Sequence, residues 1–136
     1  MEMQISFPGG VAVKADYKGF SIVSDQPEAN GGSNSEPSPF DLFLISLGNC
    51  AGFFALRFCQ QRDLDTSGLG LSLSAQRNPE TRRLDKVAIT IQLPAGFPDK
   101  YRQAIIKATD QCAVKKAILD PPEFEVVTRD RSQSAV

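Results

Sequence analysis

The chain contains no histidine in its 136 residues. This absence excludes Ser-His-Asp and Cys-His nucleophilic centres as well as imidazole metal sites. Cysteine is also scarce: the three present are separated by nine residues (Cys50 to Cys59) and by 53 (Cys59 to Cys112), spacings that match no zinc or iron–sulfur pattern. We therefore expect no metal and no bound cofactor. Any chemistry must come from thiols, carboxylates, lysine, arginine or tyrosine.

An excess of charge of one sign is lacking as well. The chain has 15 basic and 16 acidic residues and no long basic run, which argues against a nucleic-acid partner. The first residues lack the basic start and apolar core of a secretion signal. The longest apolar stretch is interrupted by Asp41, Asn49 and Arg57, so no membrane span is expected. These features predict a cytoplasmic protein, in which a disulfide would be transient rather than structural.

The length and composition are those of one globular domain over residues 1–136, with 41% apolar and 23% charged residues. Alternating apolar residues predict strands, and apolar residues at steps of three and four predict helices. The order β-β-β-α-β-β-α-β places the chain in the α+β class. The expected strands are residues 3–7, 9–16, 20–24, 69–76, 87–93 and 124–127, and the expected helices are residues 39–62 and 98–119.

The first expected helix has a strong start signal and an unusual surface. Ser38 suits the N-cap, Pro39 suits the first helical position, and Asp41 completes a capping box, so we interpret Asp41 as a capping rather than a catalytic acid. The helix that follows is apolar on nearly every side, and each large apolar side chain left in water forgoes about 1.5–3 kcal/mol. One sheet and one further helix do not cover all sides. A homodimer that buries this helix is the simplest solution.

Three segments carry motifs of a known family. Residues 31–42 read GGSNSEPSPFDL, residues 46–50 read SLGNC, and residues 112–114 read CAV. These motifs, in this order of elements, resemble the OsmC/Ohr family, the osmotically inducible protein C and organic hydroperoxide resistance proteins, over nearly the whole chain. The resemblance implies an antiparallel sheet with two principal helices in an intertwined homodimer. The cysteine helices would lie at the centre of that dimer and the sites at the subunit interface.

The resemblance also implies a chemistry. Cys50 aligns with the peroxidatic cysteine, which attacks a hydroperoxide and becomes a sulfenic acid, and Cys112 aligns with the resolving cysteine, which closes a disulfide. An external thiol or dithiol reductant would then restore both thiols. Cys59 lies half a turn round the helix from Cys50, and we interpret it as a packing residue.

A thiolate in an apolar site needs positive potential. The peroxidases of the family supply it with an arginine from the N-terminal strands, but residues 1–56 of this chain contain no arginine. The candidate cations are Lys14 and Lys18 from the first strands and Arg57 on the cysteine helix. In the resemblance, a glutamate ten residues before the cysteine holds the arginine; Phe40 stands at that position here, and Asp41, one residue later, is the candidate orienting acid. Lys115 and Lys116 are further candidates that are more typical of a solvated helix surface.

Two functions remain open at this point. The first is a dimeric cysteine-based hydroperoxide reductase acting in oxidative-stress defence. The second is a binding protein or redox sensor that holds an apolar or acyl ligand at the subunit interface, with the cysteines as packing residues. An apolar pocket would favour organic hydroperoxides over hydrogen peroxide. The aromatic candidates to line such a pocket are Phe40, Phe43, Phe53 and Phe54.

Overall fold

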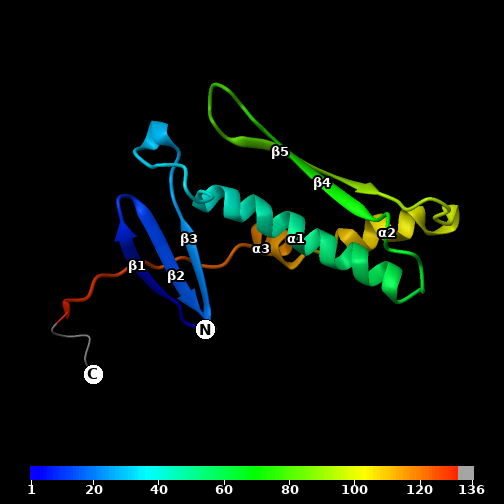
Figure 1. Cartoon of the computed structure of the whole chain (residues 1–136), viewed down its shortest axis with the longest axis horizontal. Coiled ribbons are helices and arrows are strands. Elements are labelled where there is room, and N and C mark those ends of the chain that lie inside the picture. Colours follow the sequence, from blue (N-terminus) through cyan, green and yellow to red (C-terminus); the bar gives the residue numbers. More distant parts are fainter. Residues whose placement is uncertain (132–136) are drawn as a thin grey trace.

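The computed structural model describes residues 1–131. This part of the chain is built from two separate antiparallel sheets and three α-helices (Figure 1), which confirms the α+β class. The first sheet has the order β1-β2-β3, and the second is the hairpin β4-β5. The elements are β1 Gln4–Gly9, β2 Ala12–Tyr17, β3 Phe20–Ser24, α1 Pro39–Gln60, β4 Gly70–Arg77, β5 Leu84–Gln92, α2 Arg102–Thr109 and α3 Ala113–Leu119, with 3-10 turns at Glu28–Asn30 and Asp99–Tyr101.

Helix α1 begins with the expected capping box. The Ser38 hydroxyl accepts a hydrogen bond from the Asp41 N–H at 3.1 Å, and the Asp41 carboxylate accepts one from the Ser38 N–H at 3.0 Å. Pro39 occupies the first turn, where its missing N–H costs no helical hydrogen bond. Asp41 is therefore a capping residue in this structure. By length and composition alone α1 is long and apolar enough to cross a membrane, a test that the core helix of a globular protein also passes.

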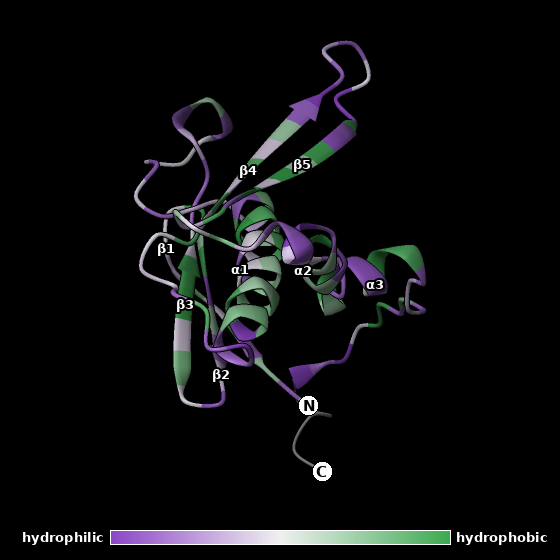
Figure 2. Ribbon diagram, turned by 90° about the vertical axis from the view of Figure 1, so that its right-hand side faces the viewer, coloured by the Kyte–Doolittle hydropathy of each residue, from purple (hydrophilic) through white to green (hydrophobic). Residues whose placement is uncertain are grey.

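The core lies between α1, α2 and the β4-β5 hairpin. Its buried members are Ala55, Phe58 and Cys59 from α1 together with Phe97 and Ile105. Cys59 is completely buried, which confirms its interpretation as a packing residue. Figure 2 shows α2 and α3 on one side of α1 and the three-stranded sheet on the other. Only one flank of the long apolar helix is therefore covered by the second half of the chain.

The three-stranded sheet has an uncovered apolar surface. Phe7 on β1 is 79% exposed and Phe20 on β3 is 67% exposed. Figure 1 shows this sheet beyond the N-terminal end of α1, while the β4-β5 hairpin lies along the helix. The two sheets share no strand pairing. The apolar side chains of the first sheet thus lack a packing partner within the described part of the chain.

The prediction of one continuous helix over residues 98–119 is wrong. Residues 98–119 form a 3-10 turn, then α2, then a break at residues 110–112, then α3. Cys112 has a non-helical backbone and acts as the N-cap of α3, where its sulfur accepts a hydrogen bond from the Lys115 N–H at 3.4 Å. The side chain thus satisfies a backbone donor that a continuous helix would have bonded to a carbonyl.

The expected last strand, residues 124–127, is also absent from the described part of the chain. These residues form no strand, and Val126 is 94% exposed. A strand needs a ladder partner for its backbone N–H and C=O groups, and residues 1–131 provide none for this segment. Alternating apolar residues alone therefore do not make a strand here.

The loop from β3 to α1 is organised by the buried carboxylate of Asp25. One carboxylate oxygen accepts hydrogen bonds from the N–H and hydroxyl of Ser33, at 3.1 and 3.0 Å, and from the N–H and hydroxyl of Ser35, at 3.1 and 2.9 Å. The Asp25 N–H donates to the Pro37 carbonyl at 3.1 Å, which closes the loop just before the cap of α1. Asp25 thereby joins the end of the sheet to the start of the cysteine helix.

We predict that Asp25 makes the fold sensitive to acid. Hydrogen bonds from the Gln26 N–H, from Ser35 and from Ser33 hold the pKa of the Asp25 carboxyl well below its usual range. A depressed pKa in the folded state gives stability that is present above the unfolded pKa of about 4 and is lost as the pH falls below it. Calorimetry should show a lower melting temperature for Asp25→Asn at pH 7, and a melting temperature that depends less on acid than that of the wild type.

The control for this prediction is Asp120→Asn, which changes an exposed carboxylate at the end of α3. It should leave both the melting temperature and its pH dependence close to the wild type. Parallel acid profiles for the wild type and Asp25→Asn would contradict the assigned role.

Candidate functional site

The structure brings Cys50 and Cys112 together. Cys50 lies half-buried in the middle of α1, and Cys112 is 4% exposed at the start of α3. The Cys50 sulfur accepts hydrogen bonds from the Cys112 thiol and from the backbone N–H groups of Val114 and Ala113. All three cysteines of the chain are free thiols in this structure. Two thiols that share a hydrogen bond are the pair in this chain from which a disulfide can form.

The surroundings shift the pKa values of the two thiols in opposite directions. Burial raises the pKa of the Cys50 thiol, but hydrogen bonds from Cys112, Val114 and Ala113 outweigh it and leave the pKa below its ordinary value. For Cys112, burial is the largest influence and raises the pKa above the ordinary value. The two shifts have opposite directions, with the Cys112 thiol as donor and the Cys50 sulfur as acceptor. This is the polarity expected of a nucleophile beside a proton donor.

The break between α2 and α3 creates this arrangement. It turns the first amides of α3 toward α1, where they meet the Cys50 sulfur. The turn is held by an ion pair between Lys115 and Asp110 and by a hydrogen bond from Lys116 to Gln111 at 3.1 Å. Lys115 and Lys116 thus stabilise the turn that contains Cys112.

The three candidate cations have partners elsewhere. Lys14 on β2 pairs with Asp16 at 3.5 Å, and Lys18, in the turn after β2, lies 5.1 Å from the ring centre of Tyr17. Arg57 donates a hydrogen bond to Gln60 at 3.4 Å on the exposed side of α1. Within residues 1–131, none of the three makes a hydrogen bond or ion pair with Cys50. The donors around Cys50 are backbone amides and a thiol.

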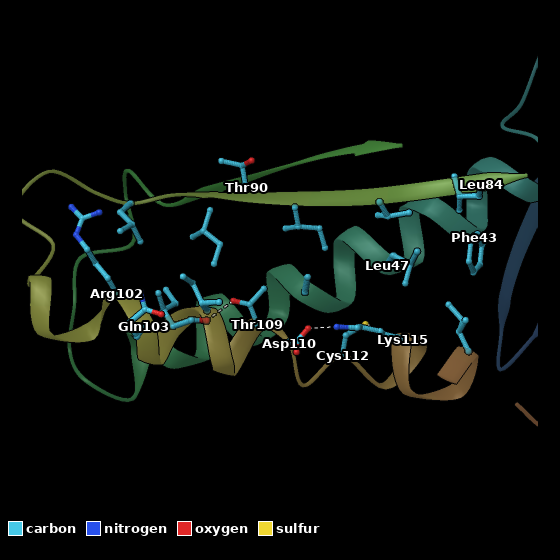
Figure 3. Close-up of a pocket in the computed structure, with 18 residues that line it drawn as sticks. Phe43, Leu47, Leu84, Thr90, Arg102, Gln103, Thr109, Asp110, Cys112 and Lys115 are labelled. Carbon is cyan, nitrogen blue, oxygen red and sulfur yellow. Dashed lines mark hydrogen bonds and ion pairs between the residues drawn. The ribbon is translucent and has the colours of Figure 1, made fainter. Parts of the chain in front are cut away.

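A groove of about 920 Å³ is lined by Cys112, whereas Cys50 is not among its lining residues (Figure 3). Strand β5 forms one wall, α2 and α3 form the other, and α1 forms the floor. Cys112 lines it near the middle. Most of the other lining side chains are aliphatic, among them Leu47 from α1, Ile89 and Ile91 from β5 and Ile105 from α2. The groove offers a predominantly apolar surface leading to a thiol.

The aromatic candidates are divided between the groove and its surroundings. Phe43 lines the groove, and the ring of Phe40 packs against Phe43 with 5.4 Å between centroids. Phe53 and Phe54 form an edge-to-face pair, 5.3 Å apart, outside this lining. The aliphatic residues that line most of the groove were not among the candidates. Their signal was the alternation of Val, Ile and Leu along residues 87–93, which places one apolar face of β5 over the helices.

Among residues 1–131, no group of three or more His, Cys, Asp or Glu side chains is placed to hold a metal ion. The chemistry that this arrangement supports is that of two adjacent thiols beside an apolar surface.

Comparison with known protein families identifies the chain. The family model described as OsmC-like protein matches residues 32–127, which is more than half of the chain and includes both Cys50 and Cys112. The chain belongs to the OsmC-like protein family. No curated protein sequence matches the chain.

Solved structures share the OsmC fold with this chain at low sequence identity. A protein from Psychrobacter arcticus named for osmotic stress induction and a detoxification response has a TM-score of 0.72 at 22% identity, over 85% of each chain. An OsmC-like protein from Mycoplasma pneumoniae has a TM-score of 0.65 at 13% identity, over 89% of each chain. An organic hydroperoxide resistance protein OsmC from Legionella pneumophila has a TM-score of 0.55 at 15% identity, over 87% of this chain and 89% of that one.

We predict that Cys112 tunes Cys50 in this OsmC-like protein through its hydrogen bond. In a Cys59→Ser background, Cys112→Ala should raise the pKa of Cys50, because the mutation removes the thiol donor to the thiolate. Cys112→Ser supplies a hydroxyl donor in the same place and should raise it less. The ultraviolet absorbance of the thiolate, followed against pH, measures both effects. An unchanged Cys50 pKa in Cys112→Ala would show that the backbone amides act alone.

Proposed function

We propose that this OsmC-like protein is a thiol-dependent hydroperoxide reductase that acts in oxidative-stress defence. The observation that carries the proposal is the pairing of Cys50 on α1 with Cys112 at the start of α3, where the Cys112 thiol and two backbone amides donate to the Cys50 sulfur. Membership of the OsmC-like family supports it, as does the shared fold with a protein named as an organic hydroperoxide resistance protein. The apolar lining of the neighbouring groove favours organic hydroperoxides as substrates over hydrogen peroxide.

The proposed reaction has three balanced steps. The Cys50 thiol releases its proton to solvent, and the thiolate attacks the terminal peroxide oxygen of ROOH. The O–O bond breaks, and the leaving alkoxide takes a proton from solvent to become ROH. The resulting Cys50 sulfenic acid condenses with the Cys112 thiol, which forms the S–S bond and releases water. An external thiol or dithiol then reduces the disulfide, becoming a disulfide itself, and both cysteines regain their protons. Cys50 is peroxidatic and Cys112 is resolving in this scheme, and no metal or bound cofactor takes part.

Backbone amides take the place of an activating arginine in this proposal. Partial positive charge from the Ala113 and Val114 N–H groups stabilises the Cys50 thiolate without a cation in the same chain. Lys14 lies on β2 and Lys18 in the turn that follows it, and within residues 1–131 neither is among the partners of Cys50. A role for either lysine in the reaction requires a second copy of the chain.

We also propose that the functional protein is an intertwined cytoplasmic homodimer. On α1, Ile45, Phe53 and Leu56 form an exposed apolar stripe on the flank away from the core. The exposed apolar residues of the three-stranded sheet add to this surface. Leaving each such side chain in water forgoes about 1.5–3 kcal/mol, so burial against a second copy is strongly favoured.

The first test of the proposed function is disulfide formation. Treating the reduced protein with one equivalent of cumene hydroperoxide should join Cys50 to Cys112 within one chain, as peptide mapping would show, and should leave the buried Cys59 free. Cys50→Ser should abolish peroxide consumption, and Cys112→Ser should stop after one turnover at the sulfenic acid or beyond. Cys59→Ser is the matched control and should keep turning over. A Cys50 that stays reduced in excess hydroperoxide, in folded protein, would overturn the reductase.

The second test concerns the dimer. Sedimentation at micromolar concentration should give a species near twice 14.8 kDa. Phe53→Glu places a charge in the exposed apolar stripe of α1 and should shift this species toward the monomer. Gln61→Glu adds the same charge just beyond the helix and should leave the dimer intact. A stable, folded monomer of the wild type would contradict the proposal.

A second candidate function is favoured by the groove itself. Its aliphatic lining suits an apolar or acyl ligand whether or not the thiols turn over. In that case the protein would be a binding protein or redox sensor, with Cys50 and Cys112 reporting the redox state.

A further inference from the structure

The first amides of α3 donate their hydrogen bonds to sulfur atoms. The N–H of Lys115 donates to the Cys112 sulfur at 3.4 Å. The N–H groups of Ala113 and Val114 donate to the Cys50 sulfur. The first amides of any helix lack a carbonyl partner within that helix, so these three depend on other acceptors. In α3 both of those acceptors belong to the cysteine pair.

Helix α3 has little other support within residues 1–131. It has seven residues, none of which is buried, and a helix this short is not stable by itself. Leu119 at its end is 73% exposed, and residues 120–131 that follow are exposed as well. The ion pair between Lys115 and Asp110 joins α3 to the preceding turn (Figure 3). Exposed segments with few buried contacts are the parts of a protein that open most readily.

A disulfide between Cys50 and Cys112 changes both sulfur acceptors at once. Hydrogen bonds to an anion are about twice as strong as bonds to a neutral group, and the disulfide replaces the Cys50 thiolate of the proposed reaction with a neutral sulfur. A disulfide also holds its two sulfurs about 2.0 Å apart, closer than a hydrogen bond does. The Cys112 sulfur must therefore move toward Cys50, away from the position in which it accepts from Lys115.

We propose that α3 is a redox-sensitive latch, ordered over the cysteine pair while both thiols are reduced and loosened when they form a disulfide, so that oxidation itself opens the pair to the reductant. The latch rests on the proposed function, because the proposed reaction forms this disulfide. In that reaction the two thiols give two electrons to ROOH, and the products are the disulfide, ROH and water. A dithiol returns two electrons and two protons and becomes a disulfide itself.

The latch addresses the access of the reductant to the disulfide. Thiol–disulfide exchange requires the attacking thiolate to reach one of the two sulfurs. Cys112 is only 4% exposed, and the half-buried Cys50 accepts hydrogen bonds from the first amides of α3. Lys115 and Ile118 of α3 also form part of the wall of the groove that Cys112 lines. Loosening α3 therefore uncovers both sulfurs in the oxidised protein alone.

Hydrogen–deuterium exchange tests the latch without hydroperoxide. Diamide takes two hydrogen atoms from a pair of thiols and leaves a disulfide, so the reduced wild type is compared with the diamide-oxidised one after peptide mapping of the Cys50–Cys112 bond. Exchange in residues 113–119 should become about tenfold faster or more on oxidation, as expected when a hydrogen bond to a charged group is lost. Exchange in α2, the internal reference, should not change.

The control for diamide itself is Cys50→Ser/Cys112→Ser, which cannot form the bond and should show no response in residues 113–119. Equal exchange of these residues in reduced and oxidised wild type would overturn the latch. Faster exchange in α2 as well would also overturn it, because the whole fold would then have loosened. A folded protein in which diamide forms no Cys50–Cys112 bond would have the same consequence.

A pair of variants tests whether α3 controls access to the disulfide. Asp110→Asn and Lys115→Gln each break the ion pair that holds α3 to the turn, and each should speed reduction of the disulfide by dithiothreitol, by up to about fivefold. The two substitutions change the local charge in opposite directions. An electrostatic effect on the attacking thiolate would therefore speed one reaction and slow the other, and that result would overturn the role of α3. Unchanged rates in both variants would overturn it too.

These outcomes are separate from those that test the reductase. A protein in which diamide loosens α3 but cumene hydroperoxide leaves Cys50 reduced keeps the latch and loses the reductase. A protein that consumes cumene hydroperoxide while exchange in residues 113–119 stays the same keeps the reductase and loses the latch.

Discussion

The burial of one long apolar helix is the constraint on which this structure depends. Helix α1 carries large apolar side chains on nearly all sides, and its own chain covers only one flank, with α2 and the β4-β5 hairpin. The covered flank holds the core and fixes Cys59 within it. The other flank and the three-stranded sheet expose apolar side chains. We propose a dimer because a second copy of the chain would bury them. The fold and the proposed dimer would both remove apolar surface of α1 from water.

The cysteine site depends on a break in secondary structure. A continuous helix over residues 98–119 would have satisfied its amides internally, whereas the break at residues 110–112 frees the first amides of α3. Two of them donate to the Cys50 sulfur, and a third donates to Cys112. A thiolate in an apolar setting loses its hydration, and fixed donors replace that hydration without bringing a charge of their own. In the proposed function these donors take the role that an arginine has in the resembling peroxidases, since the first 56 residues contain no arginine.

The groove connects this site to the rest of the molecule. Its walls come from β5, α2 and α3, three elements that belong to the second half of the chain, while its floor is the same α1 that carries Cys50. The apolar side chains that define it are also core residues or their neighbours. Substitutions that alter packing between α1 and β5 therefore change the groove together with the stability of the fold.

The sequence by itself determined the α+β class, the capped cysteine helix and the family, because a capping box, a strict alternation and a spaced motif are local patterns that need no partner. It also determined that Cys59 is a packing residue, from its position on the helix. Only the tertiary structure decided that residues 98–119 break at Cys112, since a periodic helix signal does not show that a side chain caps a new helix. It also decided that residues 124–127 form no strand in the described chain, because a strand requires a partner that periodicity does not supply. The donors to Cys50 lie more than 60 residues away from it along the chain, so only packing brings them to the site.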